Sequence, residues 1–86
     1  MGPDTVELLL AFGHAFGIEI PNEVGAKLVS VRDVQNYVLA EYARQGRTAN
    51  PDAIFEKIRA MTADITGVER NKISLDSTFV DGLGLD

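Results

Sequence analysis

Residues 4–21 have the sequence DTVELLLAFGHAFGIEIP, and this stretch predicts a helix that runs into an extended loop. Asp4 favours a helix start because its carboxylate can accept hydrogen bonds from the free amide groups of the first turn. Apolar residues then recur at spacings of three and four as far as Phe16, which is the pattern of a helix with a wide buried face. Gly17 is a natural helix stop, and Pro21 disfavours a helix at the residue before it. We therefore expect the helix to end at Phe16.

The next part of the chain predicts a short helix and then a long one. The short helix is expected over 22–28, with Asn22 as its cap. Ser30 and Asp33 have the spacing of a capping box, in which a hydroxyl cap is followed three residues later by a carboxylate. An apolar stripe at helical spacing follows this box. The long helix is therefore expected over 31–44.

The last predicted helix has the clearest start in the chain. Asn50 is a good capping residue. Pro51 is well suited to the first helical position, because an amide hydrogen at that position would have no partner within the helix. Gly67 stops the apolar stripe that follows, so we expect a helix over 51–66.

Two segments outside these helices complete the pattern. Residues 45–50 contain no apolar side chain larger than that of alanine, so they are expected to form a linker. Residues 68–86 form a long connection with apolar anchors along its length, which predicts that it packs rather than moving freely. The pattern predicts one all-α domain over 1–86, a bundle of three main helices and a short one.

The composition narrows the possible functions. The chain has no cysteine, which rules out disulfides and thiolate metal sites, and its net charge is −5. An acidic protein is poorly suited to nucleic acid or to an anionic membrane surface, and no apolar run is long enough to cross a membrane. The start of the chain does not predict a signal peptide, and Met1-Gly2-Pro3 is typical of an added start. We expect a cytoplasmic protein.

Two parts of the sequence resemble acyl carrier proteins. The segments DTVELLL (4–10) and FGIEIP (16–21) are similar to the second helix of that family and the loop after it. The segments ITGV (65–68), ISLDSTF (73–79) and DGLGLD (81–86) are similar to the end of the family's first helix and its long first loop. The resemblance therefore covers most of the chain and implies an acyl-carrier-like bundle. Together with the apolar stripes, it predicts ten buried side chains: Leu8, Phe12, Phe16, Ile20, Val34, Val38, Ile54, Ile58, Ile65 and Phe79.

The order of these parts is reversed relative to the family. Residues 52–86 match the family's first helix and long loop, yet here they follow residues 4–44, which match its second to last helices. The resemblance therefore implies a circular permutation, with residues 45–51 joining the family's natural ends. We expect this order to be engineered. Six or seven extended residues reach roughly 20 Å, enough to close one end of a bundle.

The resemblance also implies a covalent cofactor that this chain is not expected to carry. Family members attach 4'-phosphopantetheine to a serine at the start of their second helix and carry acyl chains on it as thioesters in fatty acid or related biosynthesis. That serine would fall between Asp86 and Asp4, where the chain has Gly2 and Pro3 instead. We therefore expect no cofactor on this chain and no enzymatic activity, because carriers perform no reaction themselves.

Acidic and apolar side chains around the family's second helix dock onto basic patches of synthase enzymes. By position, this implies a partner-binding set in the present chain. The set consists of Asp4, Val6, Glu7, Leu10, Glu23 and Asp86. Gly13 and His14 stand where acids are common in the family, so the match is incomplete.

The other chemically reactive residues have structural interpretations. Ser74 begins a Ser-Leu-Asp triplet, but in the family register it lies in the middle of the long loop, as does Ser77, and Ser30 is expected to be a helix cap. The single histidine, His14, falls on the polar side of the first helix with no nucleophile beside it. No metal site is expected, because the acids that could bind a cation lack the spacing it requires. These acids are Asp81, Asp86, Glu19 and Glu23.

The sequence leads to one preferred function and one alternative. The preferred function is that of a permuted acyl carrier protein that cannot be loaded. The alternative is a helical interaction module that binds a synthase through its acidic face without belonging to the carriers. In either case the chain is expected to be a monomer or a dimer formed by segment exchange.

Overall fold

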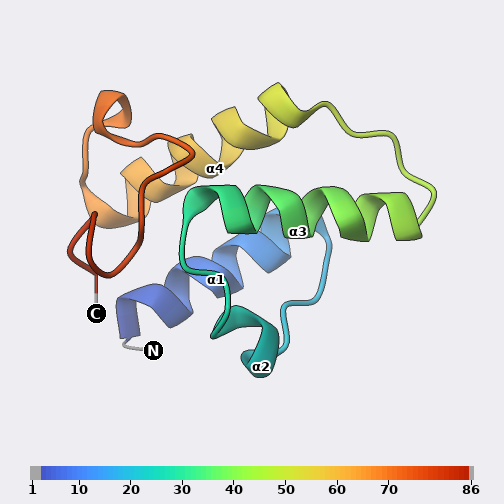
Figure 1. Ribbon diagram of the computed structural model, residues 1–86, viewed down its shortest axis with the longest axis horizontal. Coiled ribbons are helices and arrows are strands. Elements are labelled where there is room, and N and C mark those ends of the chain that lie inside the picture. Colours follow the sequence, from blue (N-terminus) through green and yellow to red (C-terminus); the bar gives the residue numbers. More distant parts are fainter. Residues whose placement is uncertain (1–2, 86) are drawn as a thin grey trace.

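Four α-helices and one 3₁₀ turn make up the regular structure of the protein, a computed structural model that describes residues 3–85 (Figure 1). No strand occurs in these residues, so the predicted all-α class is confirmed. The elements are α1 (Pro3–Phe16), α2 (Asn22–Gly25), α3 (Val31–Arg44), α4 (Pro51–Thr66) and η1 (Arg70–Lys72).

The two later helices begin as their capping residues predict. The Ser30 hydroxyl accepts a hydrogen bond from the Asp33 amide at 3.2 Å, and the Asp33 carboxylate accepts one from the Ser30 amide at 3.1 Å. At the start of α4, the Asn50 side chain accepts a hydrogen bond from the Asp52 amide at 2.9 Å. Gly67 ends that helix in a left-handed conformation with φ of 78°. These contacts satisfy amide groups that have no partner within the helix.

The first two helices differ from the prediction at their ends. Helix α1 already includes Pro3, so Asp4 lies inside its first turn rather than capping it. Helix α2 stops at Gly25 rather than at residue 28, and the residue before it is Pro21, with no side-chain cap from Asn22. The chain leaves the α-helix early because it tightens into a turn, with Leu28 donating to the Gly25 carbonyl at 3.1 Å. This turn directs Leu28 into the core.

The long connection after α4 packs against the start of α3, as its apolar anchors predict. The Val31 amide donates to the Ser77 carbonyl at 3.0 Å, and the Phe79 amide donates to the Val29 carbonyl at 3.0 Å. The Arg32 guanidinium also pairs with Asp76 at 2.9 Å. These bonds attach residues 75–79 to a segment more than forty positions earlier in the chain.

The core contains side chains from α1, α3 and α4 and from the long connection after α4. Eight of the ten side chains expected to be buried are buried: Leu8, Phe12, Phe16, Val34, Val38, Ile54, Ile58 and Phe79. The other two, Ile20 and Ile65, are only partly buried and pack at the edge of this core. Ile20 remains partly exposed because it lines a surface groove.

Candidate partner-binding surface

The solvent-facing side of α1 carries an apolar and acidic stripe, which we define as Asp4, Val6, Glu7, Leu10 and His14. Residues three or four positions apart lie above one another on a helix, so these side chains share one face. Leu10 is 70% exposed and Val6 is 38% exposed, although both are apolar. The exposed leucine and valine, together with the neighbouring carboxylates, make this side of α1 the candidate contact surface.

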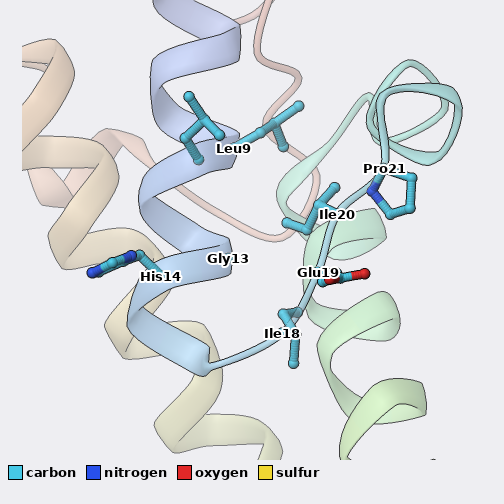
Figure 2. A pocket seen from close by; sticks show the side chains of 8 residues that line it. Leu9, Gly13, His14, Ile18, Glu19, Ile20 and Pro21 are labelled. Atoms are coloured by element: carbon cyan, nitrogen blue, oxygen red, sulfur yellow. The ribbon is translucent and has the colours of Figure 1, made fainter.

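A groove of about 460 Å³ runs along α1 next to this stripe (Figure 2). One wall is α1 and the other is the extended segment 18–21, whose Ile20 side chain points toward the helix while Glu19 points away from it (Figure 2). The groove is lined by Leu9, Leu10, Gly13, His14, Ile18, Glu19, Ile20 and Pro21. A smaller hollow next to it is lined by Val6 and Leu10 together with Asn22 of α2. Val6 and Leu10 therefore border α2, the helix that carries Glu23.

Close approach of the 18–21 segment depends on Gly13. The Ile18 amide donates to the Gly13 carbonyl at 3.0 Å. A Cβ atom at position 13 would lie 3.0 Å from the Ile18 carbonyl oxygen, tighter than most real contacts of this kind, so the loop would have to shift. A glycine inside a helix is otherwise unfavourable, so this contact explains its presence.

Side chains from distant parts of the chain hold the end of α1 and the loop after it. The Tyr37 hydroxyl of α3 donates to the Glu19 carbonyl at 2.8 Å. At the end of α1, Arg47 donates to the Phe16 carbonyl at 3.0 Å, and Lys57 donates to the Ala15 carbonyl at 3.2 Å. Cations are favoured at a helix C-terminus, where the free carbonyl groups carry partial negative charge. No local sequence pattern predicts that Tyr37, Arg47 and Lys57 contact α1 or the loop after it.

The hydrogen bond from Tyr37 to the loop at Glu19 is expected to stabilise the folded protein. Tyr37→Phe removes the donor to Glu19 and keeps the ring, so we expect the free energy of unfolding to fall by about 1 kcal/mol at about pH 7. Burial, followed by the negative charge of Glu41, raises the pKa of the Tyr37 hydroxyl above its usual range.

A raised pKa means that this stabilising contribution is complete below the unfolded-state pKa of about 10 and is lost as the pH rises through the folded-state pKa. Urea unfolding of both proteins should therefore show a difference that shrinks at alkaline pH. Equal stability at neutral pH would show that the hydroxyl does not hold the loop.

The remaining candidates from the sequence lie where a structural role explains them. Ser30 caps α3, and the Ser74 and Ser77 hydroxyls face each other at 3.5 Å within the long connection rather than at the start of a helix. His14 is exposed, as expected for a solvated residue, yet it also lines the groove. Asp86 lies outside the described residues. Within residues 3–85, no three potential metal ligands come together and no helix is both long and apolar enough to cross a membrane.

Two curated relatives each match part of this chain. A segment of 36 residues is 47% identical to an acyl carrier protein from Chloroherpeton thalassium, and it covers 42% of this chain and 45% of that relative. A 35-residue segment is 49% identical to an acyl carrier protein from Campylobacter hominis, covering 41% of this chain and 44% of that relative. A segment of this chain is therefore related to acyl carrier proteins.

The acyl carrier relationship extends over less than half of the length of these relatives. No protein-family profile matches the chain, and no solved structure matches it. The all-α architecture agrees with the relationship, and the matching relatives are named as carriers rather than as enzymes.

Proposed function

We propose that this chain is an acyl-carrier-type domain whose two segments occur in swapped order. The packing of α4 against both α1 and α3 carries this proposal, because the swapped order requires the later helix to close a bundle with the earlier ones. The start of α1 and the last described residues also lie at the same end of the molecule (Figure 1). The opposite end is closed by the 45–50 linker between α3 and α4.

The limited length of the sequence match supports the same proposal. A comparison that keeps residue order can align only one of two swapped segments with a normally ordered relative. The segments 4–44 and 52–86 contain 41 and 35 residues, so each match, of 36 or 35 residues, is about as long as one segment. A normally ordered relative of this similarity would be expected to match over most of its length.

The proposed domain binds partners but carries no acyl group. Met1, Gly2 and Pro3 precede Asp4 in the 86-residue chain, and none of them has the hydroxyl that would take phosphopantetheine. The partners proposed are acyl-chain synthase enzymes with basic docking patches, which would meet the stripe on α1. Val6 and Leu10 supply the apolar contact, and Asp4, Glu7 and Glu23 supply the charge.

The alternative, an interaction module outside the carrier function, is supported by the same exposed surface. Leu10 is 70% exposed, and an exposed leucine of this kind would suit the docking helix of an interaction module as well as that of a carrier. Both functions require binding, so binding is the property to test first.

Reversal of one charge on the stripe tests this docking surface. Glu7→Lys is expected to weaken binding to a synthase component with a basic patch by about fivefold, roughly 1 kcal/mol, because an exposed attraction becomes a repulsion. The affinity of the unchanged chain should fall as salt is added, since exposed charges are screened. Titration calorimetry at two salt concentrations measures both effects. Glu69→Lys is the matched control, because Glu69 is also exposed but lies before η1. An equal loss in the two variants would reject the α1 stripe as the docking surface.

A further inference from the structure

The protein consists of two halves that are joined by one short linker. The first half contains α1 to α3, and the second half contains α4 and the long connection after it. Helix α4 packs on both α1 and α3, so its helix–helix contacts lie between the halves rather than within one of them. Residues 45–50 are the covalent link between the halves, and five of these six residues are exposed.

The contact between the halves is extensive and specific. The Phe12 and Phe79 rings meet in the core with centroids 6.4 Å apart. The backbone of the long connection bonds to the start of α3, with the Arg32 amide donating to the Leu75 carbonyl at 2.9 Å. None of these contacts involves the linker, so each of them could form equally well between halves of two different chains.

Few interactions hold the linker in its closed form. Gly46 has a φ of 72°, a left-handed conformation that turns the chain back after α3. Arg47 stacks 3.7 Å above the Tyr42 ring and donates to the Phe16 carbonyl. Beyond this turn the linker forms a wide arc between the ends of α3 and α4 (Figure 1). An opened linker would lose the Gly46 turn, the Arg47 contacts and the packing of Ala49 against the core. It would keep the contacts of α4 and the long connection with the first half.

We propose that the contact surface between the halves also binds a second copy of this chain, by reciprocal exchange of residues 51–85. In the exchanged dimer, α4 of each chain packs on α1 and α3 of the other. The start of α1 and the stretch 78–85 then come from different chains. The Gly46 turn and the Arg47 contacts favour the closed monomer over the exchanged dimer, because they form only when the linker turns back after α3. This inference does not depend on the acyl-carrier relationship.

Shortening the linker tests the exchange. Deletion of residues 46–49 leaves Gln45 and Asn50 between α3 and α4, and it removes the turn and the arginine contact while keeping the cap of α4. We expect this variant to be a folded dimer, with helical content per residue close to that of the intact chain, by light scattering and circular dichroism. Insertion of Gly-Ser-Gly-Ser after Gly46 is the matched control and should leave a monomer. A folded monomeric deletion variant would overturn the proposal.

The intact chain provides a second test that does not depend on how the deletion variant folds. Refolding from denaturant at high protein concentration is expected to yield a dimer fraction, which returns to monomer after dilution and a second refolding. In a dimer refolded from equal amounts of isotope-labelled and unlabelled chains, filtered NMR should detect contacts between the Phe12 ring of one chain and the Phe79 ring of the other. If the intact chain gives only monomer at every concentration, or if the dimer lacks these contacts, the proposal is wrong.

Discussion

Phe12→Ala is expected to lower the free energy of unfolding by about 3–5 kcal/mol, one of the largest losses any single substitution should cause in this protein. Phe12 is fully buried on α1, and its ring meets that of Phe79 from the later half of the chain. Removal of the ring leaves a cavity in the core, and the halves lose a contact that holds them together. A small domain has a total stability of about 5–15 kcal/mol, so the variant should be close to unfolding.

Urea unfolding followed by circular dichroism measures this loss. Leu10→Ala is the matched control, because it removes an apolar side chain from the same helix at a position that is 70% exposed. We expect the control to change the stability by about 0.5 kcal/mol or less. Similar small losses in both variants would mean that α1 does not bury Phe12 between the halves.

Much of the fold could be predicted because its signals are local in the sequence. The Ser30–Asp33 capping box and the Asn50 cap involve residues only two or three positions apart, and Gly67 ends α4 through its own backbone conformation. The end of α2 was predicted less well, because the position of Leu28 in the core, rather than local propensity, determines where that helix stops. Local patterns therefore predicted the long helices better than the short one.

The candidate site depends mainly on contacts between distant residues, which local sequence patterns do not predict. Helical spacing alone groups Val6 and Leu10 with the apolar face of α1 and does not predict their exposure. The family resemblance assigned them to a contact face, and both side chains are exposed in the structure. The contacts that shape the groove do not follow from any local pattern, because Tyr37 lies 18 positions from Glu19 and Arg47 lies 31 positions from Phe16. Only the packing of α1, α3 and the linker brings these residues together.

Restoring the family order, with a serine at the junction, is expected to change the chain from one that takes no phosphopantetheine to one that is fully modified. A reordered chain would begin with residues 52–86, continue with an inserted Ser-Leu pair, and end with residues 4–44. The inserted serine then lies between Asp86 and Asp4, directly before the residues of α1. A helix N-terminus suits a phosphate because its free amide groups and dipole favour an anion. Among the 86 residues, Ser30 caps α3, and Ser74 and Ser77 lie in the long connection rather than at the start of a helix.

Intact mass after treatment with a phosphopantetheinyl transferase and coenzyme A, measured on the two chains side by side, is the most direct test of the swapped order. A reordered chain with alanine in place of the inserted serine completes the set as a negative control. We predict that the reordered chain gains one phosphopantetheine group and that the 86-residue chain and the alanine control gain none. A gain on the 86-residue chain, mapped by digestion to Ser30, Ser74 or Ser77, would contradict the account, and so would a folded reordered chain that remains unloaded.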